Sequence, residues 1–275
     1  MASRQEQKEH ARVQRLADEQ AVAERAQRRR RLQILVGVIV IAVLVVVVAV
    51  AISAGANSSQ KTSAGIATGT TEQQISSQVQ GNLRGIPQNG TTLGNPKAKV
   101  TLTYFGDLEC PVCRAFMLDV FPQFIQDQVR TGNVKVTYKS YCTATCGSEH
   151  SLQQDMELFN AQQVAAYAAG AQDRFWEFAD LFYHEQEQEG TGYATDVYLT
   201  GIAKQIPGLD LAKWRVDRQD PALLAQVDGE VRLAEQERLP GTPALIMQGK
   251  KGEELVDNGN FPSYGDLAAA VRAVS

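Results

Sequence analysis

The stretch Cys110-Pro111-Val112-Cys113 places two cysteines at a predicted junction between a strand and a helix. An apolar run precedes it and an amphipathic run follows it. The first N–H groups of a helix lack intrahelical partners and carry the positive end of the helix dipole, so they favour a thiolate at Cys110. Pro111 suits the first helical position, and Cys113 lies one turn further on, within disulfide reach. We therefore expect Cys110 to be a nucleophile and Cys113 its partner.

The N-terminal part predicts a membrane anchor. Residues 1–33 carry nine Lys/Arg and five Asp/Glu and predict a basic, solvated tail, and residues 34–54 contain no charge. As a helix, the second segment would be about 32 Å long, enough to span a bilayer. Four arginines, 28–31, stand directly before it, so the positive-inside rule places the tail in the cytoplasm and the remainder outside.

A cleaved signal peptide is the alternative, because Ala54-Gly55-Ala56 resembles a cleavage site. The apolar stretch is longer than the ~7–15 residues usual in signal peptides, which favours an uncleaved, single-pass anchor. Residues 55–84 are rich in Ser, Gln, Thr and Gly and predict a flexible linker. After the tail the chain carries 18 Lys/Arg and 26 Asp/Glu, and this acidic balance argues against a nucleic-acid partner.

The remaining residues, 85–275, predict one α/β domain. An Asn-Gly turn at 89–90 favours a short edge hairpin at its start. Hydrophobic periodicity then predicts the following order: strand 100–105, helix 111–129, strand 134–138, a helical block at about 149–238, strands 244–247 and 255–256, and helix 264–274. The order is β-α-β, a helical insertion, then β-β-α.

Three segments resemble the motifs of membrane-anchored, DsbA-like thiol–disulfide oxidoreductases. They are Phe-Gly-Asp-Leu-Glu-Cys-Pro-Val-Cys at 105–113, Phe-Trp-Glu-Phe at 175–178 and Gly-Thr-Pro at 241–243. The resemblance runs from about residue 86 to the C-terminus and implies a thioredoxin-like fold with an inserted helical domain. It further implies that Pro243 is cis and faces the dithiol, with the Thr242 backbone presented to an extended substrate peptide.

The resemblance implies an extracytoplasmic enzyme in the plasma membrane that introduces disulfides into exported cysteine-containing proteins. A substrate thiolate would attack Cys110 of the oxidised pair, and a second substrate thiol would then expel Cys110. Val112 stands where strongly oxidising members have histidine, so we predict a less oxidising pair than theirs. A reductase or isomerase of the same fold, or a non-catalytic tethered peptide-binding module, remains the alternative.

Charged neighbours are candidates for tuning the pKa of Cys110. Arg114 is expected to add positive potential on the same helical face, whereas Asp107 and Glu109 oppose it. Asp107 is expected to be a surface or capping carboxylate, with a buried proton acceptor for Cys113 as the alternative.

A second cysteine pair, Cys142 and Cys146, follows the second predicted strand. Outside the membrane, two neighbouring thiols are normally oxidised, so a structural disulfide is favoured. A redox relay with Cys110–Cys113 is the sharper alternative, and a zinc site built from all four cysteines is the rival without catalysis.

The sequence has no G-x-G-x-x-G after a strand and no P-loop, so we expect no flavin, nicotinamide or nucleotide cofactor, and we expect no metal. Electrons must then pass to a partner. The resemblance implies a quinone-linked reoxidant in the same membrane, DsbB-like or vitamin K epoxide reductase-like.

Overall fold

The computed structural model describes residues 65–147, 150–256 and 261–275. The predicted tail at 1–33 and the predicted anchor at 34–54 lie outside these ranges. Within them, no helix is both long and apolar enough to cross a membrane.

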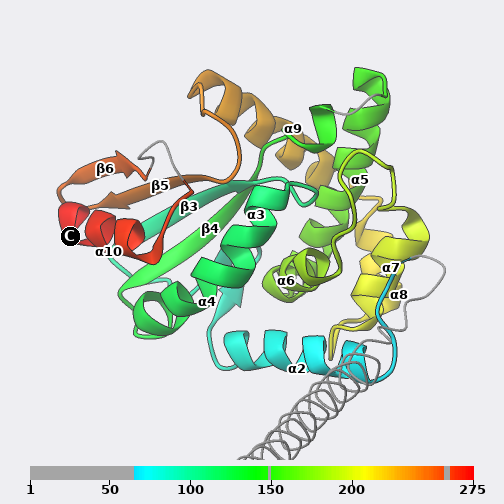
Figure 1. Cartoon of the computed structure of the whole chain (residues 1–275), viewed down its shortest axis with the longest axis horizontal. Coiled ribbons are helices and arrows are strands. Elements are labelled where there is room, and N and C mark those ends of the chain that lie inside the picture. Colours follow the sequence, from blue (N-terminus) through cyan, green and yellow to red (C-terminus); the bar gives the residue numbers. More distant parts are fainter. Residues whose placement is uncertain (1–64, 148–149, 257–260) are drawn as a thin grey trace, which may run out of the picture. The chain divides into compact units, whose positions relative to one another are not determined.

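One mixed sheet organises the domain (Figure 1). Its six strands are β1 Gln88–Asn89, β2 Thr92–Leu93, β3 Val100–Gly106, β4 Val134–Ser140, β5 Ala244–Gly249 and β6 Gly252–Leu255, in the spatial order β1-β2-β4-β3-β5-β6. The pair β3 and β4 is parallel, and the other neighbours are antiparallel. The predicted hairpin at the Asn-Gly turn is confirmed as β1 and β2.

The helix after β3 is nearly continuous from residue 111 to 129. It comprises α3 Pro111–Ala115, a π-helical segment Phe116–Val120, α4 Phe121–Phe124 and a second π-helical segment Ile125–Val129. Pro122 lies inside this run and has no N–H to donate, so the regular α-helical pattern of hydrogen bonds cannot pass through it unbroken.

The predicted helical block between β4 and β5 is confirmed. It comprises the short 3₁₀ turn η3 Thr145–Gly147 and the helices α5 Leu152–Gly170, α6 Phe175–Glu185, α7 Asp196–Lys204, α8 Leu211–Asp217 and α9 Pro221–Gln236. Figure 1 shows α5 to α8 gathered at one side of the sheet, with the last helix, α10 Tyr264–Val274, beside β5 and β6. The predicted order is confirmed, but β6 begins three residues before the predicted 255–256.

The predicted linker is wrong for its second half, where α2 occupies Thr70–Leu83. Val79 and Leu83 are buried on this helix, and Ile75 packs against the same core. These three apolar side chains recur every four residues and form one face, which packs against α6. The segment is polar overall, but this narrow apolar face is enough to pack α2 against the domain.

Aromatic side chains pack around the C-terminal end of β3. The Tyr104 ring lies edge-on to Phe116 and to Tyr138, each with ring centroids 5.3 Å apart. Gly106 completes this packing, because a Cβ there would lie 2.6 Å from Cε2 of Tyr138. The strand thus ends on a glycine because the tyrosine ring needs that space.

Candidate active site

Cys110 occupies the N-cap of α3, directly after the loop that leaves β3. Pro111 takes the first helical position, as predicted. Both cysteines of the motif are free thiols in this structure, Cys110 with 5% of its surface exposed and Cys113 with none. Only Cys110 can therefore meet a macromolecular partner.

The surroundings of Cys110 lower its thiol pKa from 9.0 to about 6. The largest cause is a hydrogen bond from the Cys113 thiol, followed among the lowering effects by the Thr242 side chain and the backbone N–H groups of Cys113 and Val112. Burial acts in the opposite direction. The helix N-terminus contributes as predicted, and at neutral pH Cys110 is mostly thiolate.

The pKa of Cys113 is shifted in the opposite direction from that of Cys110. Burial and the neighbouring Cys110 raise its pKa well above the ordinary value, while the Asp107 backbone and the Tyr104 side chain act to lower it. Tyr104 is itself fully buried, and its hydroxyl lies 3.2 Å from that of Tyr183. Sequence reasoning missed Tyr104, because a pattern of residues does not reveal which strand position reaches the buried sulfur.

The Thr242–Pro243 peptide bond is cis, as the resemblance implied. The Cys110 thiol donates a hydrogen bond to the Thr242 carbonyl oxygen at 3.4 Å. The cis-proline turn therefore stands directly against the sulfur.

An apolar groove borders the dithiol on the side of the cis-proline turn. Its volume is about 430 Å³, and it is lined by Val112, residues 240–245, Leu255, Val256, Phe261 and Pro262. Three of the lining side chains, Val112, Leu255 and Phe261, are exposed. Exposed apolar side chains beside a reactive sulfur are suited to holding an apolar stretch of polypeptide.

Asp107 is completely buried, so the predicted surface position is wrong. Its carboxylate accepts hydrogen bonds from the backbone N–H groups of Glu109, Thr143 and Thr145 and from the Thr145 hydroxyl. Burial raises the pKa of Asp107, and these hydrogen bonds oppose that rise. Asp107 thus joins the loop that leads into the C-x-x-C motif to the loop after β4 that contains Thr143 and Thr145.

The main causes of the lowered pKa of Cys110 do not include Arg114 or Glu109, and both side chains have other hydrogen-bond partners. The Arg114 Nε donates to the Tyr183 carbonyl oxygen at 2.9 Å. Buried Glu109 accepts hydrogen bonds from Gln162 at 2.6 Å and from the Gly190 N–H at 3.0 Å. Both side chains thus fasten the helical insertion to the motif.

Cys142 and Cys146 form a disulfide with a Cα–Cα distance of 5.6 Å. The favoured prediction is confirmed. Because these two cysteines are disulfide-bonded, they cannot serve as thiolate ligands in the alternative zinc site, which requires all four cysteines. Among the residues that the structure describes, no group of three or more His, Cys, Asp or Glu can hold a metal ion.

Residues 87–263 match a protein-family model described as Thioredoxin. The chain belongs to the thioredoxin family. This thioredoxin-family chain is 24% identical over 192 residues to disulfide bond formation protein D of Bacillus subtilis, an alignment covering 70% of this chain and 78% of that protein. It is 25% identical over 159 residues to the probable disulfide bond formation protein D of Bacillus anthracis, covering 58% and 69% of the two chains.

A solved structure, oxidised BdbD from Bacillus subtilis, has the same fold, with a TM-score of 0.55 and 20% identity over 68% of this chain and 95% of that one. The fold of α-DsbA1 from Wolbachia pipientis also matches, with a TM-score of 0.53, 15% identity, and 70% and 94% coverage. This member of the thioredoxin family is a thiol–disulfide oxidoreductase with a DsbA-like helical insertion.

Proposed function

We propose that this oxidoreductase is an extracytoplasmic protein disulfide oxidase, held in the plasma membrane by residues 34–54. The direction of electron transfer, from substrate to enzyme, is inferred from the lowered pKa of Cys110, about 6. Stabilising the reduced thiolate makes the corresponding disulfide a stronger oxidant. The relatives named disulfide bond formation protein D support the same direction.

In the proposed reaction, a substrate thiolate attacks the Cys110 sulfur of the oxidised pair. The Cys110–Cys113 bond breaks, a mixed disulfide forms at Cys110, and Cys113 leaves as a thiolate that takes up a proton. A second substrate thiolate then attacks the substrate sulfur of the mixed disulfide and expels the Cys110 thiolate. Two electrons have passed from the substrate to the enzyme, and the substrate holds a new disulfide.

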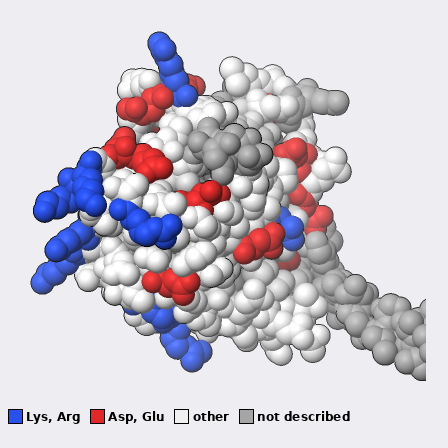
Figure 2. All heavy atoms as spheres, turned by 60° about the vertical axis from the view of Figure 1, so that its left-hand side comes forward, with Lys and Arg blue, Asp and Glu red and all other residues white. Residues whose placement is uncertain are grey.

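The proposed substrates are exported, cysteine-containing polypeptides in an extended conformation. The groove offers apolar contact, and the segment 240–243 offers backbone groups for strand-like pairing. Contacts to backbone and apolar surface suit many sequences, which fits a general oxidase. A nucleic-acid partner is not expected, and the face shown in Figure 2 carries both Lys/Arg and Asp/Glu side chains.

Reoxidation requires an electron acceptor outside the described domain. We propose a quinone-linked membrane partner, DsbB-like or vitamin K epoxide reductase-like, that takes the two electrons from Cys110 and Cys113. The predicted anchor would keep both proteins in one membrane, with residues 1–33 in the cytoplasm.

The deciding experiment is the reduction potential of Cys110–Cys113, measured by equilibration with glutathione buffers and mass-resolved alkylation of each cysteine. A potential towards about −120 to −180 mV is expected for an oxidase. A potential near about −270 mV would instead indicate a reductase or isomerase. A pair that does not cycle would leave the alternative of a tethered peptide-binding module.

Cys110→Ser separates catalysis from binding. The substitution removes the nucleophile and should abolish oxidation of a reduced test peptide while leaving its binding in the groove. If Cys110→Ser retained oxidation, the proposed nucleophile would be wrong. If altering the Thr242-Pro243 turn removed binding and the wild type showed no turnover, the non-catalytic module would be favoured.

A further inference from the structure

The loop closed by the second disulfide contacts two segments beside the dithiol: the residues that precede Cys110 and the cis-proline turn. This loop, residues 141–147, follows β4 and contains the 3₁₀ turn η3. It begins with the Tyr141 N–H donating to the Gly106 carbonyl oxygen at 3.0 Å. The Tyr141 hydroxyl then donates to the Leu239 carbonyl oxygen at 3.3 Å, just before the cis-proline turn. The loop is thus fastened at its start to both segments that frame Cys110.

The loop holds the segment before Cys110 through Asp107. The N–H groups of Thr143 and Thr145 each lie 2.9 Å from the Asp107 carboxylate, and the Thr145 hydroxyl lies 2.7 Å from it. Hydrogen bonds to a buried charge are among the stronger ones in proteins. Three of them fix the loop relative to the residues that lead into the motif.

The loop holds the cis-proline turn through Thr143. The hydroxyl oxygens of Thr143 and Thr242 lie 2.5 Å apart. Thr242 in turn stands against Cys110, whose sulfur lies 3.4 Å from the Thr242 carbonyl oxygen, and the Thr242 side chain lowers the pKa of the Cys110 thiol. When Thr143 donates to the Thr242 oxygen, the Thr242 hydrogen is left to donate to the Cys110 thiolate, and such a chain of hydroxyls strengthens each of its bonds.

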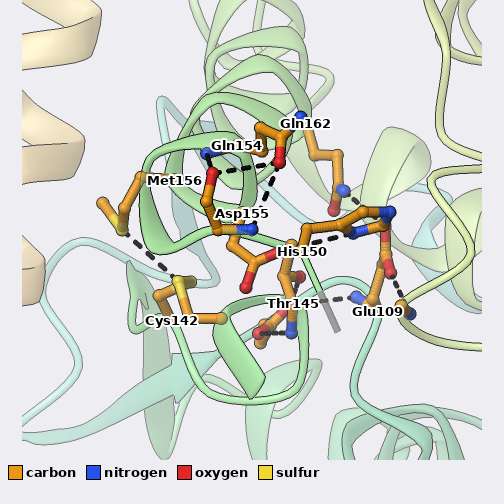
Figure 3. Close-up of polar contacts among 12 residues, drawn as sticks. Glu109, Cys142, Thr145, His150, Gln154, Asp155, Met156 and Gln162 are labelled. Atoms are coloured by element: carbon orange, nitrogen blue, oxygen red, sulfur yellow. Dashed lines mark hydrogen bonds and ion pairs between the residues drawn. A yellow bond between two sulfur atoms is a disulfide. The ribbon is translucent and has the colours of Figure 1, made fainter. Parts of the chain in front are cut away.

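The Cys142–Cys146 bond limits the movement of this loop. It spans a sequence separation of four residues. Cys146 Sγ also lies 3.3 Å from the Met156 sulfur of α5, and Figure 3 shows Met156 extending from its helix to the disulfide, with Thr145 on the same loop. A loop without the bond would have more conformations to lose when Thr143 docks.

We propose that the disulfide loop is a positioning element of the redox site: Cys142–Cys146 holds the Thr143 hydroxyl against the Thr242 hydroxyl, and so fixes the residue that contacts the reduced Cys110 sulfur. Thr143 does not touch the reacting atoms, so it is a positioning residue. The inference rests on the proposed role of Cys110 as nucleophile and extends it to a loop 32 residues further along the chain. It assigns the second disulfide a task beyond stability and requires no change in its own oxidation state.

The test is Thr143→Val in the detergent-solubilised full chain. The substitution keeps the shape and the backbone N–H to Asp107 and removes only the hydroxyl. The midpoint of the pH dependence of Cys110 alkylation should rise above about 6. The equilibrium with glutathione should shift about threefold to tenfold towards the enzyme disulfide, and a tenfold shift corresponds to about 30 mV.

Thr137→Val is the matched control, because its hydroxyl pairs at 3.0 Å with that of Thr92 inside the sheet. It removes the same kind of hydroxyl pair and should leave the alkylation midpoint and the glutathione equilibrium unchanged. Equal values for Thr143→Val and wild type, or equal shifts in both variants, would overturn the proposal. Failure of the wild-type dithiol to cycle would instead overturn the proposed function.

A second variant, with Cys142 and Cys146 both replaced by alanine, tests the disulfide itself. If the bond holds Thr143 in place, the folded variant should shift in the same direction as Thr143→Val. Adding Thr143→Val to it should then have less effect than in the wild type, because the two changes act on one contact. Full additivity of the two changes would overturn the role of the disulfide.

Discussion

The Tyr104 side chain acts on the pKa of Cys113, the thiol whose sulfur must leave when a substrate attacks the disulfide. Its hydrogen bond to Cys113 lowers the pKa of that thiol, against a much larger effect of burial. The neighbouring Tyr183 hydroxyl can donate to Tyr104 or to the Asp107 carbonyl oxygen, which lies 3.3 Å away. When Tyr183 donates to Tyr104, the Tyr104 hydrogen is free to turn towards sulfur as Cys113 becomes a thiolate.

Tyr104→Phe should slow the attack of a peptide thiol on the oxidised enzyme about tenfold. A hydrogen bond to a charged group contributes about 1.5 kcal/mol, which is about a factor of ten in rate. Stopped-flow measurement of mixed-disulfide formation gives this rate. Tyr198→Phe is the control, because Tyr198 is equally buried and its hydroxyl has no hydrogen-bond partner among the described residues. Equal slowing in both variants would mean that the hydroxyl near Cys113 has no special role.

The pKa of Cys110 predicts how the stability of the reduced protein depends on pH. The folded value, about 6, lies below the value of about 8.5 for an unfolded cysteine. The ionised thiol therefore stabilises the fold fully above the unfolded value, and this contribution is lost as pH falls through about 6. The raised pKa of Cys113 opposes stability only above the unfolded value, where an unfolded chain would ionise.

Thermal unfolding of the reduced and oxidised forms across pH measures this effect. The Tm of the reduced form minus that of the oxidised form should fall as pH decreases from about 8 to about 5, because the oxidised form has no titrating thiol. Taking the difference removes the other titrating groups that both forms share. A difference independent of pH would show that Cys110 is not ionised in the folded protein.

Val112 has 43% of its surface exposed and gives Cys110 only its backbone N–H. Val112→His would add a side chain able to carry positive charge or donate a hydrogen bond to the thiolate. The reduction potential should become less negative and the Cys110 alkylation midpoint should fall. Val112→Thr keeps the shape without a charge and should change both quantities less. A more negative potential in the histidine variant would contradict this prediction.

At the scale of the elements, β3 ends at Gly106, where two tyrosine rings fill the space that a side chain would need. A Cβ at this position would lie 2.6 Å from Cε2 of Tyr138 and 3.2 Å from Cε2 of Tyr104. Gly106→Ala must therefore displace rings that have no free space around them. We expect a loss of about 1–3 kcal/mol in the free energy of unfolding, measured by denaturant titration.

Gly81→Ala in α2 is the control for Gly106→Ala. A Cβ at Gly81 would have nothing within 4 Å, and alanine favours a helix over glycine. This variant should be unchanged or slightly more stable. A stable Gly106→Ala protein with normal thiol kinetics would show that the tyrosine pair can repack, and that the close approach at the end of β3 is not required.

The elements of the fold were largely predictable because each carries its own periodic pattern. The strand 100–105, the helix 264–274 and the helical block between them were visible in the sequence. The helix α2 was not, since only Ile75, Val79 and Leu83 break a polar stretch. Its position depends on a complementary surface on α6, and that surface exists only in the folded domain.

For the whole molecule, the site is assembled from three segments far apart in the chain. Two of them, the C-x-x-C motif and the cis-proline turn, have motifs that the sequence displays. The third is the disulfide loop, whose contact with Thr242 joins residues 99 positions apart. The burial of Asp107 likewise follows from this assembly, because two loops must converge on one carboxylate before it is removed from water.

The groove beside the dithiol gives the last prediction, which concerns how a whole substrate docks. Leu255 on β6 is 39% exposed and lines this groove. Leu255→Asp should raise the KM for a reduced protein substrate about tenfold, because a charge there opposes burial of an apolar peptide. The rate with glutathione should stay the same, since a small thiol needs only the Cys110 sulfur. Val216→Asp, at an exposed apolar position of α8, is the matched control and should change neither value. Equal loss of activity towards glutathione and protein would place the effect of Leu255 on the dithiol itself and remove the groove from substrate binding.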